Sequence, residues 1–206
     1  ELQPSQAVAR QVLDVQVAQK TGWRSRLAMV FSRVAIKLEQ PETALAVLKE
    51  AFQKEPQNLS LLQSLADAYL ANGLYQDAYD AASKVIEQQP VELDTVNWFV
   101  NLGSQLRKHP GVIQTLVQSD MIRVLENAIH TAPSRVDLLF QLGKLFLEKG
   151  EKQPALDVFR KLTALNVDNW QVDAQELHQV GTAVREMGDA SLSVILLEKA
   201  IEKTGY

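Results

Sequence analysis

The sequence has no cysteine among its 206 residues, which excludes disulfides, thiolate metal sites and cysteine nucleophiles together. Aromatic residues make up only 6%, and no apolar run reaches the roughly 18 residues that a membrane-spanning helix requires. Basic residues are never clustered enough to attract a phosphate backbone, and the net charge is −4, so direct nucleic-acid binding is disfavoured. A chain without cysteine suits the cytoplasm as well as the bacterial periplasm, with a slight preference for the periplasm.

The residues that are present favour helices. Hydrophobic residues make up 46%, many of them Ala and Leu, and β-branched runs of strand length are absent. The seven prolines and nine glycines fall mostly between apolar-periodic segments. We therefore expect an all-α fold. Glu1 in place of a methionine indicates a fragment or a mature chain, such as a segment of a larger bacterial protein.

The clearest signal is an internal repeat. Pro56 and Pro90 lie 34 residues apart, and each follows an amphipathic segment. The residues before Pro90 run in the order Leu65, Ala66, Tyr69, Gly73, Ala78, Ala82 and Val85. After Pro133 the same spacings return as Leu142, Gly143, Phe146, Gly150, Ala155, Phe159 and Leu162.

On these residues the chain resembles the tetratricopeptide-repeat family. The resemblance implies a right-handed superhelical solenoid of about five antiparallel helix pairs, preceded by a leading helix over 1–23 and together forming a single unit over 1–206. The repeats would span 24–56, 57–90, 91–133, 134–167 and 168–206. Turn glycines at Gly73 and Gly150 are expected in the left-handed conformation. In the first repeat Glu39 replaces the turn glycine, and Pro41 begins a second helix.

Two segments depart from the repeat. The third repeat carries nine extra residues near 110–120, which favours a lengthened helix, although Ser119 and Asp120 could instead cap a new one. A longer connection over 167–173 contains Trp170, for which core packing and partner contact stay open. Trp98 is expected to pack between helices, and Trp23 to seal the leading helix onto the array.

No pattern of catalytic residues emerges. His109 and His130 lie in the third repeat and His178 in the fifth, each without a second histidine at ligand spacing. Phosphate-binding glycine loops and Gly-x-Ser-x-Gly elbows are both missing from the sequence. We expect no enzymatic activity, no cofactor and no metal.

The resemblance also places a binding surface. In this family a partner lies in a concave groove lined by the first helix of each pair. Carried over by register, the partner-binding candidates are Arg33, Gln63, Asp67, Asn97, Asn101, Phe140, Gln141, Lys144, Gln175 and His178. The paired Lys and Asn with which one subclass grips a C-terminal carboxylate are not found at these positions. The amide-rich wall suits a peptide backbone or the hydroxyls of a polysaccharide.

Three functions follow as hypotheses. The first is a protein–protein interaction scaffold, whose partner is a peptide or a domain surface of another protein. The second is a periplasmic scaffold in bacterial exopolysaccharide secretion, in contact with polysaccharide-export machinery. The third is weak self-association, since Leu192, Ile195 and Leu196 could form an apolar face near the C-terminal end.

Overall fold

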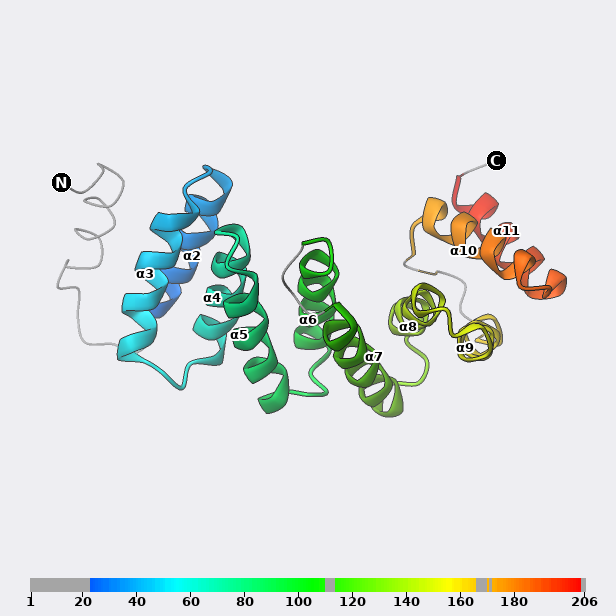
Figure 1. Cartoon of the computed structure of the whole chain (residues 1–206), viewed down its shortest axis with the longest axis horizontal. Helices are drawn as coiled ribbons and strands as arrows, with labels where there is room; N and C mark the ends of the chain where they lie inside the picture. Colours follow the sequence, from blue (N-terminus) through cyan, green and yellow to red (C-terminus); the bar gives the residue numbers. More distant parts are fainter. Residues whose placement is uncertain (1–22, 110–113, 166–169, 171, 205–206) are drawn as a thin grey trace. The chain divides into compact units, whose positions relative to one another are not determined.

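The computed structural model describes residues 23–109, 114–165, 170 and 172–204. These residues form ten α-helices and no strand (Figure 1). The helices are α2 Trp23–Lys37, α3 Pro41–Lys54, α4 Leu59–Ala71, α5 Tyr75–Gln88, α6 Leu93–Leu106, α7 Gln114–Thr131, α8 Val136–Lys149, α9 Lys152–Thr163, α10 Ala174–Glu186 and α11 Ala190–Thr204. The all-α prediction is confirmed, and the predicted leading helix lies outside the described residues.

Backbone chemistry explains where the helices begin and end. Gly73 and Gly150 have φ values of 72° and 81°, the left-handed conformation predicted for both. Glu39 takes the same conformation with φ of 58°, although it has a side chain that disfavours it. Pro41 occupies the start of α3, where a missing N–H is harmless. Each of α3, α5 and α7 ends two residues before a proline, as predicted.

The third helix pair shows how the extra residues are used. Helix α7 runs unbroken for 18 residues, so Ser119 and Asp120 lie inside it rather than at a new helix start. The lengthened helix is therefore confirmed, and the alternative of a break at these residues is wrong. Residues 110–113 of the predicted insertion lie outside the described residues.

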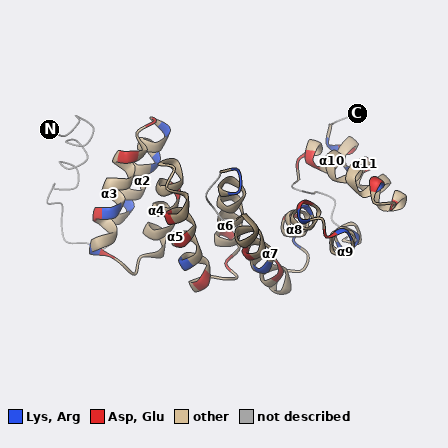
Figure 2. Ribbon diagram, in the orientation of Figure 1, with Lys and Arg blue, Asp and Glu red and all other residues tan. Residues whose placement is uncertain are grey.

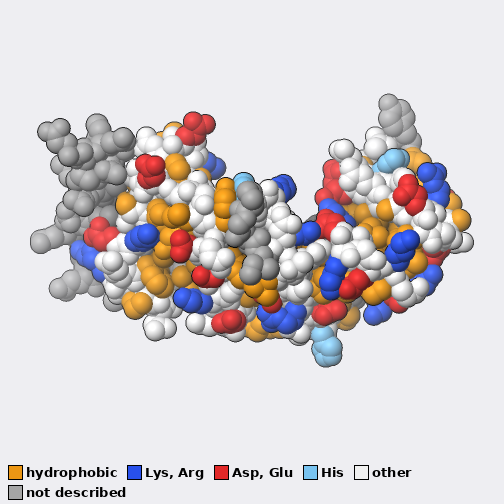
Figure 3. Space-filling model, in the orientation of Figure 1, with side chains coloured by type: hydrophobic (Ala, Val, Ile, Leu, Met, Phe, Trp, Pro, Cys, Tyr) orange, Lys and Arg blue, Asp and Glu red, His pale blue; other side chains and the backbone are white. Residues whose placement is uncertain are grey.

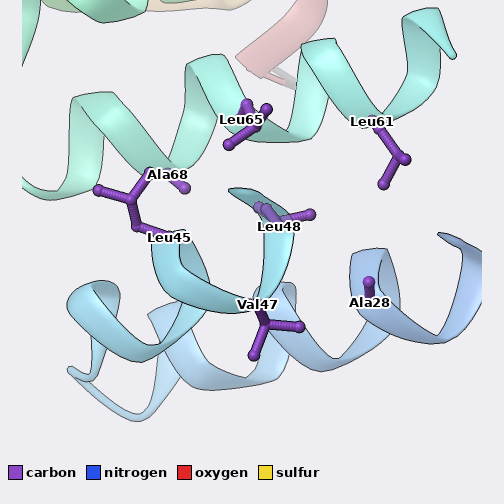
Figure 4. Packing of buried hydrophobic residues seen from close by; sticks show 7 residues of the cluster. All are labelled: Ala28, Leu45, Val47, Leu48, Leu61, Leu65 and Ala68. Carbon is purple, nitrogen blue, oxygen red and sulfur yellow. The ribbon is translucent and has the colours of Figure 1, made fainter. Parts of the chain in front are cut away.

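The chain divides into two compact units. Unit 1 contains α2 to α5 with Trp98–Val117, and unit 2 contains Pro90–Asn97 with the chain from Gln118. Helices α6 and α7 thus contribute to both. Within unit 1, one apolar cluster joins α2, α3 and α4 (Figure 4). Its members are Ala28, Leu45, Val47, Leu48, Leu61, Leu65 and Ala68.

In unit 2, helices approach closely at two glycines. A Cβ atom on Gly143 would lie 2.5 Å from two ring atoms of Phe159, and one on Gly181 would lie 2.9 Å from Leu197. Only a glycine fits such contacts without movement of its neighbour. Trp170 is 2% exposed and belongs to the core of this unit, which decides between its two predicted roles.

Candidate functional site

The first helices of the pairs in unit 1 present polar side chains to solvent. Arg33 on α2, Asp67 on α4 and Asn101 on α6 are exposed, and Gln63 on α4 is half-buried. These are four of the positions predicted to line a binding wall. We call the solvent-facing sides of α2, α4 and the Trp98–Leu106 part of α6 the first-helix face of unit 1; Figure 2 colours its charged positions.

Asp67 interacts with residues of both neighbouring first helices. Its Oδ1 accepts a hydrogen bond of 2.8 Å from the indole Nε1 of Trp98, which joins α4 to α6. Part of the Asp67 side chain reaches solvent, yet the surrounding protein displaces water from the carboxyl group, and this desolvation raises its pKa. The Trp98 hydrogen bond and the positive charge of Arg33 oppose the rise.

Trp98 therefore does more than fill space between helices. The side chain is half-buried, and its N–H holds a carboxylate that faces the solvent side of the unit. An indole that offers an apolar surface and has its polar atom satisfied is a frequent anchor in protein interfaces. The predicted packing role of Trp98 is thus compatible with a role in partner contact.

Unit 2 contains a second contact of the same kind. Lys144 on α8 donates a hydrogen bond of 2.5 Å to Oε1 of Glu176 on α10, and both side chains are partly exposed. The Lys144 ammonium also lies 5.8 Å from the ring centroid of Phe140. Gln175 and His178, predicted on the same helix as Glu176, are exposed. Sequence analysis missed Glu176, although a charge 32 residues from Lys144 fits neighbouring repeats.

Three predicted wall residues lie differently from expectation. Phe140 is 2% exposed and packs edge-on against Phe159 at 6.1 Å, so its ring is part of the core and does not line a surface. The placement of Phe140 on a solvent-facing wall is therefore corrected, because α8 buries a broader arc of its circumference. Asn97 and Gln141 are half-buried, and their side-chain carbonyl oxygens are buried without a hydrogen-bond partner among the described residues.

Among the described residues, no group of three His, Asp or Glu side chains lies close enough together to hold a metal ion. His109 stacks on Tyr75 with ring centroids 4.1 Å apart. Within the ranges that the structure describes, no helix is both long and apolar enough to cross a membrane.

Comparisons with known proteins agree with this architecture. A tetratricopeptide-repeat family model matches residues 35–94. The human PEX5-related protein is 27% identical over 144 residues, which is 65% of this chain but only 22% of the human protein. This chain therefore spans about a fifth of that relative's length.

Two solved structures share the fold at low sequence identity. MamA (41-end) from Desulfovibrio magneticus RS-1 has a TM-score of 0.64 at 18% identity, covering 89% of this chain and 96% of that one. TTC0263, a thermophilic tetratricopeptide-repeat protein of Thermus thermophilus, has a TM-score of 0.54 at 18% identity, covering 86% and 90%. With its recurring small residues, turn glycines and paired helices, the chain has a tetratricopeptide-repeat-like fold, and residues 35–94 match the model of that family.

Proposed function

We propose that this chain is an interaction scaffold that holds a segment of another protein on the first-helix faces of its units. The observation that carries the proposal is the Arg33, Asp67 and Trp98 cluster, which gathers a cation, a carboxylate and an indole from three successive first helices. A rigid surface with polar groups and an aromatic anchor suits recognition of a peptide. The tetratricopeptide-repeat fold supports the same interpretation.

The test is loss of partners from two matched variants. Trp98→Ala removes the anchor in unit 1, while Lys84→Ala changes an exposed side chain on a second helix, α5. Proteins captured from an extract of the source organism would be quantified for both variants and the unaltered chain. We expect Trp98→Ala to deplete captured proteins that Lys84→Ala retains. Equal recovery from all three chains, with unchanged helical circular dichroism, would contradict the proposal.

Lys144→Glu extends the test to unit 2. The substitution places a negative charge beside Glu176 and removes the cation from above Phe140. Its effect on stability is small because the pair is exposed. Depletion of the same partners as in Trp98→Ala would mean that both units take part in binding, whereas full retention would confine binding to unit 1.

Self-association is a second candidate because α11 has an exposed apolar edge. Val194, Ile195 and Ile201 are 52%, 40% and 56% exposed, and hydrophobic side chains reach the surface in this region (Figure 3). Of the three residues predicted to form this face, Ile195 is exposed, while Leu192 and Leu196 are 4% and 0% exposed and belong to the core. Light scattering over a wide range of concentration would decide, and a strict monomer would remove this candidate.

The exopolysaccharide hypothesis gains no observation of its own. Of the amides that motivated it, Asn101 and Gln175 are exposed, but the carbonyl oxygens of Asn97 and Gln141 are buried. Binding to a glycan array would be needed to raise it above a prediction from family resemblance.

A further inference from the structure

Helix α2 differs in charge from the other described helices. It contains Arg24, Arg26, Arg33 and Lys37 and no Asp or Glu, whereas every other described helix with a Lys or Arg also has an acidic residue. The whole chain has a net charge of −4. A helix with four cations is therefore a local exception in an acidic protein.

Three of the cations form a stripe with one valine. Arg26, Val30, Arg33 and Lys37 follow the spacing i, i+4, i+7 and i+11, which keeps them on one side of a helix. All four side chains are exposed, Val30 by 58%. The opposite side of α2 is made of the small buried residues Ser25, Ala28, Ser32 and Ala35. We call the four exposed residues the basic stripe.

Within the described part of the chain, the cations of the basic stripe have no salt bridges. Cations on other helices, such as Lys54, Arg123 and Lys199, have carboxylate partners on their own helices. Arg33 has only the more distant attraction of Asp67, whose Oδ1 is bound to Trp98. The positive charge of the stripe is therefore available to a ligand.

From this arrangement we infer that the basic stripe of α2 binds an acidic segment of the partner protein. Carboxylates of the segment lie against Arg26, Arg33 and Lys37, and an apolar side chain lies on Val30 between them. Arginine offers paired N–H donors that match a carboxylate, which favours Asp and Glu side chains as ligands. The inference rests on the proposed scaffold function and adds the chemistry of the partner.

The geometry favours a peptide over a nucleic acid. The stripe covers about 11 residue steps of one helix, or about 16 Å, and three cations are few for the phosphate contacts that hold a duplex. Val30, an exposed apolar side chain that offers no contact to a phosphate group, lies in the middle of the stripe. A peptide with spaced carboxylates and one apolar side chain meets all of these groups.

The experiment uses synthetic peptides and two charge-matched variants of the full chain. The acidic peptide is a fluorescent 16-mer with glutamates at positions 2, 9 and 13 and leucine at position 6; its lysine counterpart and a 16-base-pair DNA duplex are the comparison probes. The stripe variant is Arg26→Gln with Arg33→Gln and Lys37→Gln. The control variant, Lys84→Gln with Lys152→Gln and Lys161→Gln, removes the same charge from the exposed surfaces of α5 and α9.

We expect the acidic peptide to bind the unaltered chain, and to bind the stripe variant about tenfold more weakly. The loss follows because each of the three exposed cations contributes a few tenths of a kcal/mol or more to binding. The control variant would change affinity by less than about twofold, and the lysine peptide would not bind. An equal loss in both variants, or DNA binding as tight as peptide binding, would overturn the inference. Absence of peptide binding, with captured partners still depleted by Trp98→Ala, would overturn it and leave the scaffold function standing.

Discussion

The two units join successive first helices at equivalent positions but with different chemistry. In unit 1, Asp67 follows the small residue Ala66 and bonds to Trp98; in unit 2, Lys144 follows Gly143 and bonds to Glu176. Trp98 and Glu176 both lie four residues before a Leu/Val–Gly pair. The repeat thus determines where neighbouring helices meet, while individual side chains decide whether the contact is a partly desolvated hydrogen bond or an exposed ion pair.

A similar contrast exists inside the helix pairs. Gly143 faces Phe159, with no room for a methyl group, while the equivalent positions in unit 1 are Ala66 and Ala82, both fully buried. In unit 2 the large Phe159 ring on α9 therefore fills the space left by the missing side chain of Gly143 on α8. Small residues at this position are required by the facing side chain and not by helix formation itself, since glycine weakens a helix by about 1 kcal/mol relative to alanine.

The largest effect is expected when this match is broken. Gly143→Ala should lower the free energy of unfolding by about 1–3 kcal/mol, because the new Cβ overlaps the Phe159 ring despite the better helix propensity of alanine. Ala66→Gly should cost only about 1 kcal/mol, mainly through propensity. Urea unfolding followed by circular dichroism would measure both.

A double substitution provides the control for the Gly143→Ala prediction. In a Phe159→Ala background the obstructing ring is gone, so Gly143→Ala should become neutral or stabilising by up to about 1 kcal/mol. A loss of stability of the same size in both backgrounds would mean that the contact between Gly143 and Phe159 is not what limits this position.

The next effect concerns the contact between α4 and α6. Trp98→Phe keeps an aromatic ring but removes the N–H that lowers the pKa of Asp67, so that pKa should rise further above its ordinary value. Carboxyl resonances of Asp67, followed by NMR during titration, would measure the shift. An unchanged or lower pKa in the variant would show that the hydrogen bond is not formed in solution.

The free energy of unfolding should depend on pH through the same Asp67 carboxyl group. A carboxyl whose pKa is raised by folding favours the native state when protonated, and this contribution is lost as pH rises through the folded pKa. The Trp98 hydrogen bond to the ionised carboxylate offsets part of that loss. Trp98→Phe should therefore lower the free energy of unfolding by roughly 1 kcal/mol at about pH 7, after allowance for exposure. The same substitution should cost less below the ordinary aspartate pKa of about 4, where the carboxyl is protonated.

Sequence reasoning succeeded where backbone chemistry decides the structure. Pro41 and Gly150 could be placed because a proline and a left-handed glycine have few alternative positions. The residues of the binding wall were harder to predict, because successive residues of a helix point about 100° apart and a small error in register changes which side chains are exposed. Phe140 shares the register of Gln63, yet its ring turns toward Phe159 while the glutamine stays half-buried. The hydrogen bond between Asp67 and Trp98 depends on the directions of two side chains on different helices, and the spacing of residues in the sequence does not determine these directions.

The turns offer a smaller comparison between the units. Gly150 ends α8 in the left-handed conformation without strain, whereas Glu39 adopts φ of 58° with a side chain. Glu39→Gly should stabilise unit 1 by about 0.5 kcal/mol, the difference between the relieved left-handed strain and the larger chain entropy of glycine. Gly150→Ala should do the opposite and lower the urea midpoint. A destabilised Glu39→Gly variant would mean that the Glu39 side chain has a stabilising contact that outweighs its backbone conformation.

The smallest effect is expected at the ion pair of unit 2. Lys144→Gln and Glu176→Gln should each reduce stability by less than about 1 kcal/mol, since the Lys144 and Glu176 side chains are 32% and 44% exposed and water competes for both charges. Raising the salt concentration to about 1 M should erase most of the difference from the unaltered chain, because the screening length falls to about 3 Å. Trp98→Phe, which removes a partly desolvated hydrogen bond, should keep most of its cost at the same salt. If the two losses of stability respond equally to salt, the contacts in the two units are of one electrostatic kind and differ only in the side chains that form them.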